Sequence, residues 1–225
     1  GFGLVQAMAS LDLPVLPFGA SREVAPGDSL IIAGSGGREA TLAACCVGRQ
    51  PFAGYWEYWI AEAIMTAPAH PFWGGAAAID EHGRLAGVAS LQVEAGDAKS
   101  SQSLNMVIPI DLLPPVLDDL VKYGRPNRPA RPWLGIYATE LGERIVIAGI
   151  ADDGPAEQAG VEIGDILVAV AGEKATALGE VWRRIWAQGP AGVEIPLLIE
   201  RQDRVLEVRV KSADRLLFTR ARVIH

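Results

Sequence analysis

The sequence contains little cysteine and little histidine, which argues against two common kinds of site. Its two cysteines, Cys45 and Cys46, are neighbours, so on a strand their side chains would point to opposite faces. A disulfide between them would be strained, and we expect buried thiols that pack as small hydrophobes. The three histidines, His70, His82 and His225, lack the regular spacing of a zinc site. We therefore expect no metal and no other cofactor.

Positive charge and long apolar runs are also scarce. The 225 residues carry a net charge of -7, which argues against a general affinity for nucleic acid or for anionic lipid. No apolar run approaches the ~20 residues that span a bilayer, and the start of the chain lacks the form of a signal peptide. Hydrophobic residues make up 50% of the sequence, and glycine and proline are frequent. We expect a folded, β-rich protein with room for two domains.

Serine and threonine are absent from the residues between Pro68 and Ser90. The pattern there predicts a β-hairpin. A sharp loop with Gly74 and Gly75 precedes a strand over residues 76–79, and a polar turn leads to a second strand over 85–90.

This hairpin resembles the N-P-G-N-S-G-G-P-L-V-D-x-x-G-x-V-V-G-I element of the trypsin-like proteases of the HtrA group. In that register Gly74 stands at the nucleophilic serine, Trp73 at the preceding asparagine, and His70 at an earlier asparagine. Acyl transfer needs an oxygen nucleophile, a histidine that activates it and a carboxylate that orients the histidine. Glycine has no side chain that can attack, so the resemblance implies a protease homologue that is degenerate at its nucleophile position.

Residues 1–18 include Leu11-Asp12-Leu13-Pro14-Val15-Leu16, which resembles the D-L-A-V-L strand of the same family. The resemblance places Asp12 at the triad carboxylate, although an aspartate that opens a strand is also a common turn or cap residue. In the family the catalytic histidine lies upstream of this strand, so we expect an N-terminally incomplete barrel and a vestigial Asp12. Residues 24–34 resemble the next strand of the family, and the glycines at 36 and 37 predict a plain hairpin loop.

The stretch over residues 50–65 is rich in aromatic side chains. On a continuous strand Tyr55, Glu57 and Trp59 would share one face, and Trp56 and Tyr58 the other. Such a density of aromatics favours core packing or a subunit contact over a ligand cage.

A strand is predicted over residues 105–110, followed by a helix that Asp111 caps and that runs to about Tyr123, with Gly124 as its stop. The next eight residues, RPNRPARP, interleave proline with arginine and predict a semi-stiff linker. The predicted domains are therefore a protease-type domain over 1–124, a linker over 125–132, a second module over 133–213 and a tail over 214–225.

The second module carries the most specific motif. Residues 155–167, PAEQAGVEIGDIL, resemble the S-P-A-x-x-A-G-L-x-x-G-D-V-I signature of the PDZ domains of HtrA proteins. The residues alone predict a short helix that ends at Gly160, a turn at Gly164 and a strand over 166–170. An amphipathic helix over 177–188 and two alternating strands over 193–201 and 204–211 follow.

The resemblance also implies a peptide-binding site in this module. In a PDZ domain a loop holds the free carboxylate of a peptide with its backbone N–H groups, while the peptide adds as a strand beside a helix. The alternative for each apolar residue of that helix is a purely structural place in the core. The implied carboxylate loop is Trp133, Leu134, Gly135 and Ile136, with Trp133 in place of the usual tyrosine, and the implied pocket residues are Val181, Trp182 and Ile185.

The expected fold class is mainly β: a trypsin-like, chymotrypsin-fold β-barrel domain, N-terminally incomplete, followed by an α+β PDZ domain. The leading hypothesis is a proteolytically inactive HtrA-like protein that binds protein C-termini or extended peptides. One alternative is an active HtrA-type serine endopeptidase of protein quality control whose catalytic groups lie outside these residues. Another is a structural module whose PDZ groove is filled by its own chain. The resemblance implies a bacterial protein, a homo-oligomer and a periplasmic location, and the unpaired cysteines leave the cytoplasm open.

Overall fold

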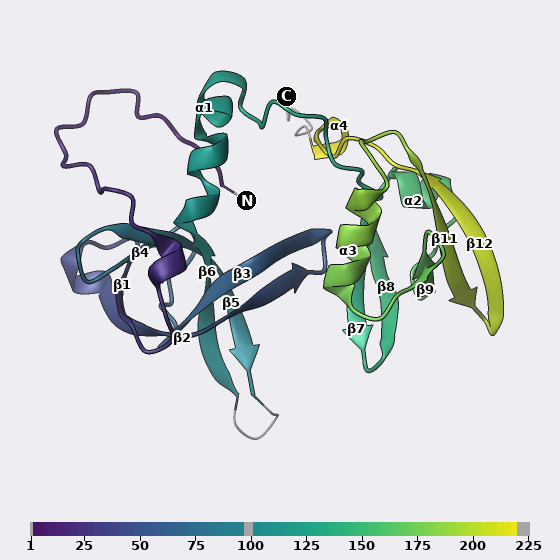
Figure 1. The fold of residues 1–225 in the computed structure, drawn as a ribbon, viewed down its shortest axis with the longest axis horizontal. Coiled ribbons are helices and arrows are strands. Elements are labelled where there is room, and N and C mark those ends of the chain that lie inside the picture. Colours follow the sequence, from purple (N-terminus) through teal and green to yellow (C-terminus); the bar gives the residue numbers. More distant parts are fainter. Residues whose placement is uncertain (1, 97–100, 220–225) are drawn as a thin grey trace. The chain divides into compact units, whose positions relative to one another are not determined.

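The computed structural model describes residues 2–96 and 101–219, and its chain forms two compact units (Figure 1). The first unit comprises Gly1–Pro51 and Ile60–Asn127, and the second comprises Phe52–Trp59 and Arg128–His225. The short segment Phe52–Trp59 therefore folds with the C-terminal half of the chain, although both of its flanks in sequence belong to the first unit.

The first unit contains a closed antiparallel barrel with the strand order β1-β2-β3-β6-β5-β4. Pairing of β4 with β1, for example Ile31 with Ile79, closes it. Closure leaves no free sheet edge in the barrel. The strands are β1 (Ser29–Ala33), β2 (Thr41–Gly54), β3 (Tyr58–Ala67), β4 (Ala77–Ile79), β5 (Leu85–Ala95) and β6 (Gln102–Pro109).

The barrel core combines branched side chains with alanine. Along β1, Leu30 and Ile32 are buried while their neighbours Ser29 and Ile31 are exposed, which is the alternation of a strand with one face on the core. The interior of a small barrel is narrow, and alanines on β4 and β5 fit it. The buried cluster is Val24, Leu30, Ile32, Ala44, Cys46, Ile64, Ala76, Ala78, Ala86, Ala89 and Val107.

The predicted hairpin around Asp80 agrees with the structure. Its two strands are β4 and β5, and the turn between them holds Gly83 at a φ of 73°. Asp80 accepts the N–H groups of His82 and Arg84 and forms an ion pair with the Arg84 guanidinium at 2.9 Å. The carboxylate therefore fastens the turn, because it satisfies main-chain donors that no strand partner reaches.

The prediction of a strand around Asp12 is wrong. Residues 2–17 contain neither helix nor strand, and Asp12 is exposed. Pro14 and Pro17 remove main-chain donors that a strand needs, and a strand gains stability only from a partner. The first regular contacts come at Phe18, which bridges to Leu85, and at a 3₁₀ turn over Ser21–Glu23.

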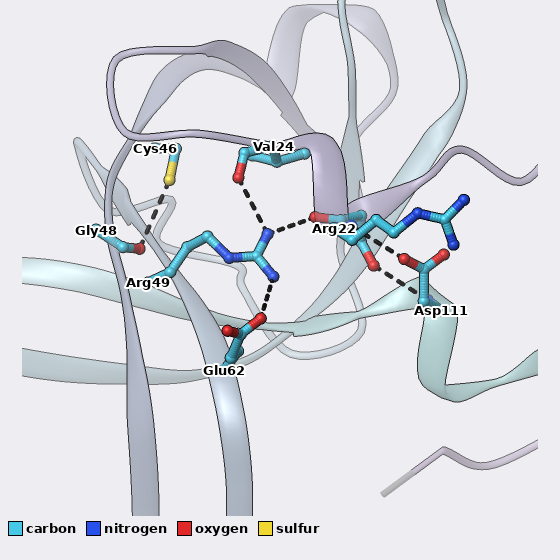
Figure 2. Close-up of polar contacts among 8 residues, drawn as sticks. Arg22, Val24, Cys46, Gly48, Arg49, Glu62 and Asp111 are labelled. Atoms are coloured by element: carbon cyan, nitrogen blue, oxygen red, sulfur yellow. Dashed lines mark hydrogen bonds and ion pairs between the residues drawn. The ribbon is translucent and has the colours of Figure 1, made fainter.

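Asp111 does not cap the following helix. It lies in a 3₁₀ turn over Ile110–Leu112, and its carboxylate accepts the N–H of Arg22 at 2.9 Å (Figure 2). The helix α1 (Pro114–Tyr123) instead begins after Leu113, with proline in its first turn and no side-chain cap. It ends as predicted at Gly124, which adopts the left-handed conformation with a φ of 69°.

Figure 2 shows how one arginine holds the same region to the barrel. The Arg49 guanidinium on β2 donates to the carbonyl groups of Ser21 and Val24 and forms an ion pair with Glu62 on β3 at 2.8 Å. The Arg49 side chain is 17% exposed and that of Glu62 is 68% exposed. Because Glu62 is largely exposed, the main role of Arg49 is to donate hydrogen bonds to main-chain carbonyl groups.

The second unit is an antiparallel sheet of order β12-β11-β9-β8-β7, with the short β10 on β9. The helix α3 packs against β7 and β9 (Figure 1). The predicted elements correspond to α2, β9, α3, β11 and β12 and agree with them to within two residues. The elements are β7 (Ile136–Leu141), β8 (Arg144–Ile150), α2 (Pro155–Gln158), β9 (Ile166–Val170), β10 (Glu173–Lys174), α3 (Leu178–Ala187), β11 (Glu194–Arg201), β12 (Arg204–Lys211) and α4 (Leu216–Thr219).

The core of this unit lies between the sheet and one face of α3. Leu178, Val181, Trp182 and Ile185 are the buried residues of that helix, at the i, i+3, i+4 and i+7 spacing that the sequence predicts. Among the helices of residues 2–96 and 101–219, none has the length and apolar character to cross a membrane.

Candidate functional site

The loop between His70 and Gly75 is held by a buried histidine. His70 is 2% exposed, and its Nε2 lies 2.6 Å from the carbonyl oxygen of Ala40. Its Nδ1 accepts the N–H of Phe72 at 3.0 Å, so the ring carries its proton on Nε2. The main-chain N–H of His70 donates to Asn105 at 2.6 Å. Both ring nitrogens are therefore engaged in holding main chain, and neither faces a hydroxyl.

Gly74 occupies an open place in this loop. A Cβ at this position would meet nothing within 4 Å, and the next residue, Gly75, has a φ of 83°. The loop is tied to the barrel by the Gly75 N–H, which donates to Ala89 at 2.9 Å. The structure therefore leaves room for a side chain at position 74.

Thr66, Cys45 and Cys46 carry a hydroxyl or a thiol in the same unit, and none of the three is hydrogen-bonded to the His70 ring. Thr66 on β3 pairs with Asn105, but its hydroxyl is fully buried and has no hydrogen-bond partner among the described residues. Cys45 lies with its Sγ 3.6 Å from the carbonyl oxygen of Ala67. Burial raises the pKa of the Cys46 thiol, and Arg49 only partly offsets this. The raised pKa of Cys46 is the opposite of what a nucleophilic thiol needs.

The described residues contain no cluster of three or more histidine, cysteine or acidic side chains that could hold a metal ion. His82 is exposed in the turn after β4, with its ring 3.9 Å from Glu81. His225 lies outside the described residues.

In the loop Trp133–Ile136 of the second unit, three successive carbonyl groups each accept a main-chain hydrogen bond. The carbonyl of Trp133 accepts the N–H of Ala213 at 2.9 Å, that of Leu134 accepts Ala156 at 2.8 Å, and that of Gly135 accepts Ala151 at 2.8 Å. These bonds fix the orientation of each peptide plane, so the N–H groups of residues 134–136 converge on one point. Gly135 permits this path with its φ of 79°.

A carboxylate occupies that point. Oε1 of Glu57 accepts the N–H groups of Leu134, Gly135 and Ile136 at 3.1, 2.7 and 3.0 Å, and Oε2 shares the Leu134 donor at 3.2 Å. Glu57 is 6% exposed. Burial raises its pKa to about 7 although the three N–H groups and the charge of Arg215 act in the opposite direction.

Glu57 comes from a turn that the sequence did not predict. The aromatic stretch over residues 50–65 is not one strand, because β2 ends at Gly54 and β3 begins at Tyr58. The residues between them form a turn, and Glu57 adopts a φ of 57°. One feature of the sequence could have indicated this contact: Glu57 is an acidic residue between two aromatic residues. A buried carboxylate is stable only if hydrogen-bond donors surround it.

The remaining predicted site residues lie around this loop or within the core. Trp133 is 8% exposed, pairs with Ala213 and packs its ring 5.0 Å from that of Phe218. Val181, Trp182 and Ile185 are all completely buried on α3. Trp182 alone of these three also donates from its indole Nε1, to the carbonyl of Gly54 at 2.9 Å.

Comparison with known proteins agrees with this description. Residues 132–212 match the PDZ domain family. The serine endoprotease DegS of Escherichia coli (strain K12) is 26% identical over 149 residues, which cover 60% of this chain and 41% of DegS. The probable periplasmic serine endoprotease DegP-like of Brucella suis biovar 1 is 26% identical over 212 residues, covering 87% and 40%. The chain thus spans about two fifths of the length of these relatives.

Solved structures show the same fold. The HtrA-type protease AlgW with a decapeptide has a TM-score of 0.55 at 20% identity, covering 91% of this chain and 66% of AlgW. The serine endoprotease from Yersinia pestis has a TM-score of 0.52 at 24% identity, covering 90% and 68%. The two units therefore have the folds of a trypsin-like β-barrel and of a PDZ domain, and residues 132–212 are a PDZ domain. In sequence the chain is similar to HtrA-type serine endoproteases.

Proposed function

We propose that this chain is a proteolytically inactive HtrA-like protein that binds the C-termini of proteins, or extended peptides, through its PDZ domain. The observation that carries the proposal is the convergence of the N–H groups of Leu134, Gly135 and Ile136 on a single carboxylate. A free C-terminus offers the same anion, and main-chain donors of this kind capture it in peptide-recognition domains. AlgW, which has the same fold, was solved with a decapeptide and with a tripeptide.

The strand β7 supports this proposal because it lies at the end of the sheet order. The outer edge of such a strand carries main-chain N–H and C=O groups without a strand partner, and an extended peptide can pair with them. The helix α3 packs against β7 and brings apolar side chains to the same side. A peptide bound there would place its carboxylate at Leu134–Ile136, directly before the start of β7.

The loop of the first unit supports the proposed inactivity toward peptide bonds. Gly74 stands at the position that the family gives to the attacking serine, and the His70 ring is engaged by Ala40 and Phe72. The second candidate function is a serine endoprotease, which the names of the DegS and DegP-like relatives favour. We expect no hydrolysis of casein and no labelling by a fluorophosphonate. Turnover that the same probe abolishes would favour the second candidate.

Peptide binding is tested by changing the loop itself. A Cβ at Gly135 would lie 3.1 Å from the Cβ of Ala151 at a φ of 79°, so Gly135→Ala would shift the donors. We expect fluorescence anisotropy to show binding of peptides with free C-termini but not of their C-terminal amides. Gly135→Ala should weaken this binding more than tenfold.

Gly142→Ala is the matched control for this change. Gly142 also has a positive φ, 62°, but lies in the exposed turn between β7 and β8 with nothing within 4 Å of an added Cβ. It therefore imposes the same backbone strain without touching the loop. Equal effects of the two substitutions, or equal binding of peptides and their amides, would contradict the assignment of Leu134–Ile136.

The proposal includes a periplasmic location, which the name of the Brucella relative gives for that protein, and a homo-oligomeric assembly. Cell fractionation tests the first. Light scattering of the purified full chain tests the second, and a monomeric mass at micromolar concentration would contradict it.

A further inference from the structure

The segment Phe52–Trp59, here called the tip segment, engages the loop of the second unit in the way that a peptide ligand would. Its Glu57 carboxylate accepts all three N–H groups of Leu134, Gly135 and Ile136. Each of these groups has one hydrogen to donate, and a second carboxylate at the same point would be repelled by the first. An external C-terminus and Glu57 therefore cannot occupy the loop together.

The main chain of the tip segment also contacts both elements that flank a PDZ ligand. The Tyr55 carbonyl accepts the N–H of Ala138 on β7 at 2.9 Å. The Gly54 carbonyl accepts the indole N–H of Trp182 on α3 at 2.9 Å. These two bonds use a strand donor and a helix donor at the place where an added strand would lie.

Aromatic packing fixes the tip segment against α3 and β7. Trp59 lies beside Gly179 on α3, where an added Cβ would come within 2.9 Å of the indole. The Arg183 guanidinium lies 5.1 Å from the centre of the same indole ring, and the Tyr55 and Tyr137 rings are 6.0 Å apart. Ala53 and Trp59 pack at the border of the unit's buried core.

The conformation of Glu57 argues that these contacts determine its position. A φ of 57° is disfavoured for a residue with a side chain. Such a conformation persists only where the surrounding structure imposes it, and it is common at ligand clamps and switches. The three hydrogen bonds from N–H donors therefore offset the cost of the strained backbone and of burying the Glu57 carboxylate.

We propose that the tip segment is an intramolecular ligand of the PDZ domain, and that Glu57 must leave the loop before an external C-terminus can bind. This inference rests on the proposed function, since it concerns the regulation of the same site. The domain then exists in two states: a closed state, with Glu57 in the loop, and an open state that binds peptide. The apparent affinity for a peptide is reduced by the fraction of molecules that are closed.

The test compares the full chain with its Glu57→Ala and Glu57→Gln variants. The probes are fluorescent peptides with free C-termini and their C-terminal amides. We expect Glu57→Ala to bind the free-carboxylate peptides at least tenfold more tightly than wild type. Glu57→Gln keeps the shape but stays neutral, and because charge on Glu57 weakens the closed state, we expect this variant to bind the peptides more weakly than wild type at pH 8. It also keeps the test interpretable if the alanine variant unfolds, which circular dichroism would show.

Glu143→Ala is the matched control, because Glu143 is an exposed glutamate in the turn between β7 and β8 of the same unit. It should bind peptides as wild type does. Hydrogen exchange of the Leu134, Gly135 and Ile136 amides without peptide gives a second readout. These amides should exchange faster in Glu57→Ala and unchanged in Glu143→Ala.

The outcomes separate this inference from the proposed function. Tighter binding by Glu57→Ala together with faster amide exchange supports both. Equal binding by wild type and both Glu57 variants overturns the intramolecular ligand and leaves peptide binding intact. Absence of binding in wild type and in folded variants overturns the proposed function itself, and with it the competition between Glu57 and a peptide.

Discussion

The loop His70–Gly75 of the first unit and the loop Trp133–Ile136 of the second unit illustrate two ways of building a site. The first would need a hydroxyl on one side chain, and Gly74 does not supply it. The second needs main-chain N–H groups in a fixed orientation, which every residue except proline can supply. In the structure these groups hold a carboxylate at 2.7 to 3.1 Å.

The difference shows why one chemistry is lost more easily than the other. A single substitution removes a nucleophile, whereas a loop of main-chain donors depends on the hydrogen bonds that orient its peptide planes. In the second unit those bonds come from Ala151 and Ala156 in one part of the chain and from Ala213 in another. Binding therefore depends on the integrity of the whole unit, whereas loss of the nucleophilic atom alone is enough to abolish acyl transfer.

The largest expected effect is the response of the carboxylate loop to pH. Burial holds the pKa of Glu57 at about 7 in the loop, against 4.5 for an ordinary glutamate. The closed state therefore binds more protons than the open state, so its stabilisation is complete below pH 4.5 and decreases as the pH rises through 7. The difference corresponds to roughly 3 kcal/mol at most. Tyr58, whose pKa burial raises to about 12, stays neutral in this range.

Nuclear magnetic resonance can follow this titration at the amides of Leu134, Gly135 and Ile136. Their chemical shifts should change between pH 5 and 8 in wild type and stay constant in Glu57→Gln. The Gly75 amide, which donates to a main-chain carbonyl in the other loop, is the internal reference. Identical titration of wild type and Glu57→Gln would assign the effect to another group and weaken the comparison between the loops.

A smaller effect should distinguish two partly buried arginines, Arg201 in the second unit and Arg49 in the first. Arg201 forms ion pairs with Glu162 and Asp165 and donates to the carbonyl of Gly160. The Asp165 side chain is 1% exposed. Burial would raise its pKa, but Arg201 and the Glu162 N–H lower it below the usual value. Arg201→Ala leaves this carboxylate without its cation, and we expect the Tm of the second unit to fall by roughly 5 °C or more.

The matched change in the first unit is Arg49→Ala. It leaves two main-chain carbonyls and Glu62, which is 68% exposed and can be hydrated. We expect a smaller loss of Tm, because no buried charge is left unpaired. Thermal unfolding followed by tryptophan fluorescence measures both variants. A larger loss for Arg49→Ala would show that main-chain acceptors matter more to this fold than a buried carboxylate.

The sequence predicts the second unit better than the first for a physical reason. Its turns contain glycines that need a positive φ, such as Gly160 at 81° and Gly164 at 96°, and these mark the ends of its elements. The barrel strand β5, predicted over 85–90, extends to Ala95 and has 11 residues. Its pairing with β6, which continues from Gly87 to Ala95, decides this length.

The candidate site also has one part that the sequence predicts and one part that it does not. The motif points to Leu134, Gly135 and Ile136, because a glycine that allows an unusual backbone path can be read from a sequence. The partner of these residues in the structure, Glu57, comes from 77 residues earlier in the chain. No local pattern links the two, since the contact depends on a turn with a positive φ at a residue that rarely adopts one. The strand predicted around Asp12 fails for a related reason. A local pattern does not show whether a distant strand is present to pair with it.

The smallest expected effect is that of restoring a hydroxyl in the first loop. Gly74→Ser should change the free energy of unfolding by no more than about 0.5 kcal/mol, because a Cβ there meets nothing within 4 Å. The variant should neither hydrolyse casein nor react with a fluorophosphonate, since both His70 nitrogens are bound to main chain and cannot accept its proton. Gly135→Ser is the matched change in the other loop, where the same atom would lie 3.1 Å from Ala151. Mass spectrometry that finds the probe on the introduced hydroxyl of Gly74→Ser would show that the first loop lacks only its nucleophile, and that the rest of its catalytic arrangement is intact.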